Sequence, residues 1–124
     1  KLPMHASGAG KAFLATLPDD QVTKLLHKKG MHTYTPHTLT PHNLKEGLAQ
    51  IRKQGFSFDD EEHALGLNCL ASAIFDRNNN VIAAISISGP SSRVGKERFK
   101  ELGELVGEVA RDISAALGES RSKA

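Results

Sequence analysis

The residues of this chain that could do chemistry are few and lie far apart in the sequence. Ser86 and Ser88 stand two positions apart in an apolar run, so a strand would present both hydroxyls on one face. There they would bond locally or line a small polar pocket. Cys69 lies in another β-rich run, and Asp59 opens an acidic cluster. A lone buried thiol is more often inert packing, and a charge run is usually solvated, so residue type alone favours neither as a functional group.

The small residues from Ser7 to Lys11 begin a predicted helix. Free amide N–H groups at such an end favour an anion, and glycine lets a ligand approach the backbone closely. The alternative, which residue types alone favour, is a capped helix whose glycines permit tight packing. The spacing is not that of a Walker A motif.

Catalytic and metal-binding patterns are weak. Cys69, His63 and Asp59 can be written as a triad, which makes a small cysteine hydrolase the enzyme alternative, but their spacing establishes no geometry. There is no Gly-x-Ser-x-Gly or His-Glu-x-x-His motif, and the six histidines match no standard metal spacing. We therefore predict that the chain is not an enzyme and uses no metal or other cofactor.

The composition is that of a single globular domain. The chain has 124 residues, of which 39% are hydrophobic and 24% charged, and a formal net charge of +2. Basic and acidic residues are too nearly balanced to indicate nucleic-acid binding by this segment alone. One cysteine allows no intrachain disulfide and suggests a cytoplasmic location. The longest apolar run, Val81 to Ile85, is far below the ~20 residues of a membrane helix, and Lys1 to Pro3 is no signal peptide.

Hydrophobic periodicity predicts an α+β fold with an antiparallel sheet covered by helices. Three strands make a thin sheet, so we expect further strands outside this chain. An amphipathic C-terminal helix could instead bind a partner subunit, which leaves an oligomerisation module as an alternative function. The predicted elements are helices 7–17, 18–29, 40–54 and 96–117 (the last ended by Gly118), a strand at 56–58, a charged turn at 59–62, and a hairpin of 67–75 and 81–88 joined by the turn 76–80.

Several motifs together resemble the effector-binding domain of IclR-family transcriptional regulators. The resemblance extends over nearly the whole chain. It rests on the segments LPMHASGAGKA at 2–12, GFSFDDEE at 55–62, GLNCLA at 66–71 and AISISGP at 84–90.

The resemblance implies that residues 1–124 form part of a GAF-like effector-binding domain. The first strands and helix of that domain, and a separate winged-helix domain that alone binds DNA, would lie outside this chain. It implies a homodimer or tetramer without membrane contact, and a small 2-oxo acid effector such as glyoxylate or pyruvate. The implied ligand residues are the backbone amides of Gly8 and Ala9, the side chains of Asp59, Cys69, Ser86 and Ser88, and the apolar walls Leu2 and Leu67.

Overall fold

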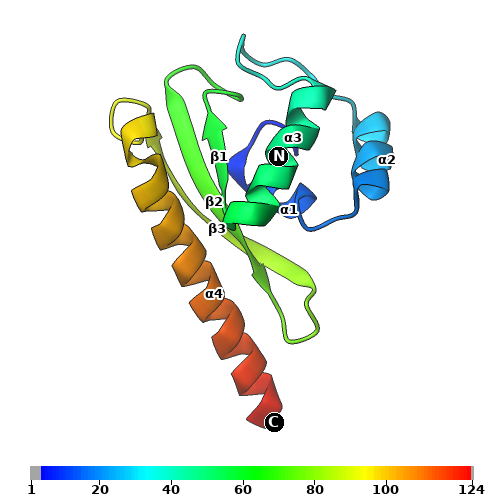
Figure 1. Cartoon of the computed structure of the whole chain (residues 1–124), viewed down its shortest axis with the longest axis vertical. Helices are drawn as coiled ribbons and strands as arrows, with labels where there is room; N and C mark the ends of the chain where they lie inside the picture. Colours follow the sequence, from blue (N-terminus) through cyan, green and yellow to red (C-terminus); the bar gives the residue numbers. More distant parts are fainter. Residues whose placement is uncertain (1–3, 124) are drawn as a thin grey trace.

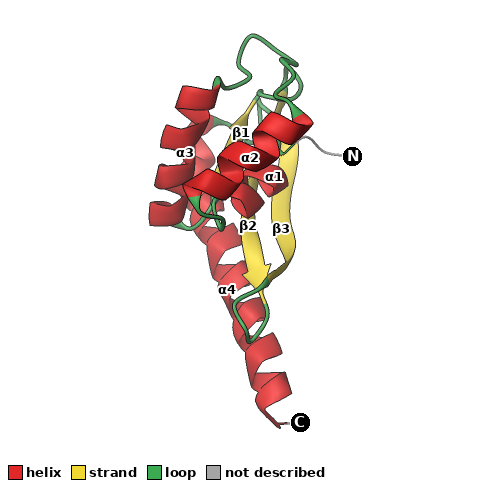
Figure 2. Cartoon of the chain, turned by 90° about the vertical axis from the view of Figure 1, so that its right-hand side faces the viewer, coloured by secondary structure: helices red, strands yellow, loops and turns green. Residues whose placement is uncertain are grey.

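The computed structural model describes residues 4–123. Helices lie on both sides of a small sheet (Figures 1 and 2). The elements in chain order are α1 (Gly8–Leu14), α2 (Asp19–Lys29), α3 (Pro41–Gln54), β1 (Ser57–Asp60), β2 (Leu67–Phe75), β3 (Val81–Pro90), the 3₁₀ turn η1 (Lys96–Arg98) and α4 (Phe99–Lys123). The predicted α+β class is confirmed.

The sheet is antiparallel with the order β1-β2-β3. A tight turn joins β2 to β3, as its polar sequence predicts. Asn79 takes a φ of 63°, and the Asp76 carboxylate accepts hydrogen bonds from the amides of Asn78 and Asn80 at 2.8 and 3.0 Å. Strand β3 continues two residues beyond the predicted end, to Pro90.

The sheet is covered differently on its two faces. Helices α1, α2 and α3 lie on one side and α4 runs along the other (Figure 1). The N-terminal helices share a core around Leu14, Val22 and Leu48, while Leu70 and Leu102 join the sheet to α4. Helix α1 contacts all three strands of the sheet.

Helix starts and stops follow local signals in part. Thr40 caps α3, accepting a hydrogen bond from the Asn43 amide, and Gly55 ends it with a φ of 90°. The prediction that the first helix extends to Leu17 is wrong. After Leu14 the chain forms a turn, and Pro18 then disfavours helical backbone at the residue before it.

Three predictions near the sheet are also corrected. Asp59 and Asp60 do not form a turn; they end β1, because both pair with residues of β2. The apolar residues of the predicted C-terminal helix do not all pack inward, because Leu105 is 50% exposed. Gly118 does not end the last helix, which continues to Lys123.

No helix among residues 4–123 is long and apolar enough to cross a membrane. Within the same residues, no cluster of three or more His, Cys, Asp or Glu side chains could hold a metal ion.

Candidate functional site

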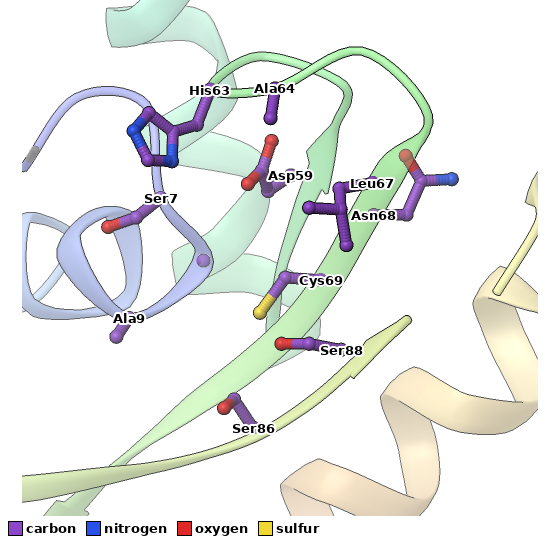
Figure 3. Close-up of a pocket in the computed structure, with 11 residues that line it drawn as sticks. Ser7, Ala9, Asp59, His63, Ala64, Leu67, Asn68, Cys69, Ser86 and Ser88 are labelled. Carbon is purple, nitrogen blue, oxygen red and sulfur yellow. The ribbon is translucent and has the colours of Figure 1, made fainter. Parts of the chain in front are cut away.

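A pocket of about 200 Å³ lies between the start of α1 and the adjoining face of the sheet (Figure 3). Its lining comes from α1, the end of β1, the loop before β2, and both hairpin strands. All of the predicted site residues that the structure describes line it; Leu2 lies outside the described residues. The lining residues are Ser7, Gly8, Ala9, Asp59, His63, Ala64, Leu67, Asn68, Cys69, Ser86 and Ser88.

Strand register explains how three of these residues meet. Asp59 is directly opposite Cys69, and Cys69 is directly opposite Ser88. Residues directly opposite each other in an antiparallel sheet project from the same face, so the three side chains form one row. Ser86 joins the same face opposite Ala71.

The start of α1 lies directly over this row. Ser7 caps the helix, its hydroxyl accepting a hydrogen bond from the Gly10 amide at 3.0 Å. The first amides of a helix have no intrahelical acceptor, which leaves those of Gly8 and Ala9 available to a ligand. The Ser57 hydroxyl donates to the Gly8 carbonyl oxygen at 2.6 Å and fastens α1 to β1.

Close packing at this point requires glycine. A Cβ atom on residue 8 would lie 2.7 Å from the Cys69 sulfur, too close for an unshifted structure. Both interpretations of Gly8 from the sequence are therefore compatible with the structure. Gly8 permits tight helix–sheet packing, and this packing brings the start of the helix to the pocket.

Asp59 is the acidic group of the pocket, and it is buried rather than solvated, with 7% of its surface exposed. Its carboxylate accepts a hydrogen bond from the Glu62 amide at 2.9 Å. Burial raises the Asp59 pKa to about 6, and the Glu62 charge adds to the rise. The amide hydrogen bond and the charges of Lys11 and His63 act in the opposite direction. Near neutral pH this side chain can therefore exchange a proton.

A buried ion pair supports the pocket. Lys11 Nζ lies 2.8 Å from Glu62 Oε1 and donates to the Phe58 carbonyl oxygen at 2.6 Å. Glu62 Oε2 also accepts from the Asp60 amide at 3.0 Å. This network ties α1 to the end of β1 and fixes the segment that carries Asp59.

Ser86 and Ser88 are exposed, and β3 is an edge strand of the described sheet. They lie on the open side of the pocket and point toward α1 (Figure 3). They therefore lack the burial that would oblige them to bond locally, and they are accessible to a ligand.

The members of the triad considered for a cysteine hydrolase all line the pocket. Among the described residues, however, the Cys69 thiol donates to the neighbouring Leu70 carbonyl oxygen at 3.8 Å and not to His63. A cysteine nucleophile is activated by an adjacent base, and among the described residues no hydrogen bond links the Cys69 thiol to a base.

His63 also lines the pocket, although the sequence did not predict it there. From the sequence it was a member of the possible triad with Cys69 and Asp59, and one of six histidines without a standard metal spacing. The available signal was its position four residues after Asp59, but the turn at Glu61, where φ is 56°, is what carries His63 back over the site.

Comparisons with known proteins agree with the fold and the residue pattern. The family model "Bacterial transcriptional regulator IclR C-terminal" matches residues 1–115. Transcriptional repressor IclR of Escherichia coli K12 is 62% identical over 98% of this chain, and the HTH-type transcriptional repressor AllR of the same strain is 52% identical over 95%. The chain spans 44% of the length of each relative. Both relatives are named as transcriptional repressors, in agreement with the prediction that the chain is not an enzyme.

Solved structures show the same architecture. The IclR protein of Thermotoga maritima has a TM-score of 0.86 and 33% identity, with 94% of this chain and 48% of that one covered. The inducer-binding domain of PobR from Acinetobacter, a double mutant in complex with 3-hydroxybenzoic acid, has a TM-score of 0.82 and 26% identity, with 91% and 68% covered. The chain belongs to the IclR family of bacterial transcriptional regulators and matches its C-terminal domain.

Proposed function

We propose that the pocket between α1 and the sheet binds a small 2-oxo acid, such as glyoxylate or pyruvate, as the effector of an IclR-type repressor. Occupancy would control DNA binding by a winged-helix domain outside this chain. The observation that carries the proposal is the convergence of the Gly8 and Ala9 amides with Asp59, Cys69 and the two serines of β3 around one cavity.

The chemistry of the lining suits a carboxylate that carries a neighbouring carbonyl. Two backbone amides and two hydroxyls can donate to its oxygens, and charge-assisted hydrogen bonds of this kind are the stronger ones. Helix α1 has only seven residues, so the complete donor set matters more than the helix dipole.

The remaining lining residues fit the other end of such a ligand. Asp59, with its raised pKa, can donate to a carbonyl oxygen when protonated or accept from a hydrated gem-diol when ionised. Leu67 and Ala64 add apolar contact. The cavity volume of about 200 Å³ favours a small molecule, and few contacts imply modest affinity.

The comparisons support an acidic effector in general terms. The PobR inducer-binding domain, in complex with 3-hydroxybenzoic acid, has the same fold. That ligand is also a carboxylic acid, although it is larger than a 2-oxo acid.

Calorimetric titration of the full-length protein with glyoxylate and pyruvate tests the proposal. We expect saturable binding of at least one acid, and a loss of about tenfold to a hundredfold in affinity for Ser86→Ala combined with Ser88→Ala. The matched control is Ser92→Ala, at an exposed serine beyond β3 and outside the pocket. No binding of either acid, or equal binding by the double variant, would overturn the assignment.

Effector control of DNA binding needs a linked arrangement of domains or subunits. We propose that the full-length protein assembles as a homodimer or tetramer and that the effector shifts its arrangement. Sedimentation of the full-length protein with and without pyruvate measures the assembly. A strict monomer would contradict this part of the proposal while leaving the ligand site intact.

A further inference from the structure

The pocket would place two negatively charged groups close together. Its lining contains the Asp59 carboxyl, and the proposed ligand is itself an anion. Like charges in a partly buried site repel each other, so anion binding is favoured by protonation of Asp59 or by a compensating cation. Among the described residues that line the pocket, His63 is the one side chain able to carry a positive charge.

The buried Lys11 ammonium is already engaged elsewhere. Lys11 Nζ is held by the Glu62 carboxylate at 2.8 Å and by the Phe58 carbonyl oxygen at 2.6 Å, and Lys11 does not line the pocket. Moving it toward a ligand would leave a buried carboxylate unpaired, which is costly. The compensating charge therefore falls to His63.

His63 is well placed for this role. Its imidazole is half-buried and lies above the cavity near Ser7 and Asp59 (Figure 3). The electrostatic interaction with His63 lowers the pKa of the Asp59 carboxyl. A ligand carboxylate bound near Ser7 would therefore lie close to a side chain that can carry a positive charge.

A second aromatic residue holds the ring. Tyr34 packs edge-on against His63, with ring centroids 4.9 Å apart and an interplanar angle of 82°. The loop that carries Tyr34 is fastened to the segment before His63, because Thr35 and Thr38 each donate a 2.6 Å hydrogen bond to its backbone carbonyl oxygens.

We propose that His63 is a ligand-contacting residue that selects acids over uncharged analogues by pairing with the ligand carboxylate, and that Tyr34 is its positioning residue. This inference rests on the proposed function. His63 would be a specificity determinant in addition to the ligand residues that the family resemblance implied.

The test compares pyruvate with its neutral amide, pyruvamide, in calorimetric titrations of the full-length protein. His63→Gln keeps a hydrogen-bonding side chain and removes the charge. We expect it to weaken pyruvate binding about tenfold and to change pyruvamide binding less than about twofold. His42→Gln is the control, because His42 is 82% exposed on α3, and it should leave both affinities unchanged.

The outcomes separate the two proposals. If the wild-type protein binds neither glyoxylate nor pyruvate, the proposed function fails. If it binds pyruvate and His63→Gln binds pyruvate equally well, or loses both pyruvate and pyruvamide to the same extent, the role of His63 is wrong while the site stands.

The positioning role has its own readout. The His63 Cε1 proton resonance should shift on pyruvate addition in the wild type and in Tyr34→Phe, which keeps the ring. The shift should shrink in Tyr34→Ala, together with the preference for pyruvate over pyruvamide. An unchanged shift and preference in Tyr34→Ala would overturn the assignment of Tyr34.

Discussion

Gly8 of α1 and Cys69 of β2 approach each other so closely that a Cβ atom on residue 8 would lie 2.7 Å from the Cys69 sulfur. The next nearest atoms to that position, Ala71 Cβ and Cys69 Cβ, are both 3.4 Å away. The sulfur is thus the main obstacle to a side chain at residue 8, and this one contact couples the start of the helix to the floor of the pocket.

Gly8→Ala should therefore destabilise the domain by about 1–3 kcal/mol through overpacking. Cys69→Ala removes the sulfur, so the double variant should recover most of the loss. Urea unfolding of the wild type, both single variants and the double variant measures the coupling free energy. Strictly additive effects would mean that the two residues are not in close contact in solution.

The raised pKa of Asp59 predicts a pH dependence of stability. The folded state holds this proton up to about pH 6, whereas the unfolded chain releases it near 3.8. The folded state therefore binds more protons between these values, and its stability from this group is present below 3.8 and is lost as the pH rises through about 6.

Asp59→Asn removes the charge and keeps an oxygen that can accept from the Glu62 amide. We expect the free energy of unfolding of this variant, minus that of the wild type, to increase as the pH rises from 4 to about 6 and then to level off. Urea unfolding at a series of pH values gives this difference. A flat difference would show that Asp59 titrates normally in the folded protein.

The buried pair of Lys11 and Glu62 should contribute far more to stability than the exposed pairs. Glu62→Gln leaves the Lys11 ammonium, whose side chain is 5% exposed, without its counter-charge. An unpaired buried charge of this kind costs about 3–5 kcal/mol.

The matched control is Glu101→Gln in the exposed pair with Arg98, where the side chains are 67% and 48% exposed. It should cost less than about 1 kcal/mol. Chemical denaturation of both variants at neutral pH makes the comparison, and equal losses would show that the buried pair carries no special weight.

Local patterns predicted most elements of the fold because they depend on neighbouring residues. The turn at Asn79 and the helix stop at Gly55 are set by residues that accept positive φ, and the structure contains both. The burial of Glu62 could not be predicted in this way, because Lys11, which neutralises it, lies 51 residues away in the sequence.

The assembly of the pocket likewise depends on long-range contacts. Periodicity places Ser86 and Ser88 on one face, but nothing local indicates that Gly8 lies over that face. The family resemblance supplied the association, and the structure brings the described residues together. His63 was missed because its place depends on the turn at Glu61 and the packing of Tyr34.

Two glycines of α4 provide a final, paired test of how this helix packs on the sheet. Both are buried in the helix interior, where glycine is about 1 kcal/mol less favourable than alanine. A Cβ atom at Gly107 would meet its nearest neighbour, an Arg111 nitrogen, at 3.4 Å, whereas one at Gly103 would lie 2.1 Å from a ring carbon of the buried Phe56. Gly107→Ala should therefore stabilise the domain by about 0.5–1 kcal/mol. Gly103→Ala should destabilise it by about 1–3 kcal/mol, although alanine has the higher helix propensity.

Urea unfolding of the two variants measures both changes in the free energy of unfolding. A stabilising Gly103→Ala would mean that α4 does not approach Phe56 as closely as the structure shows.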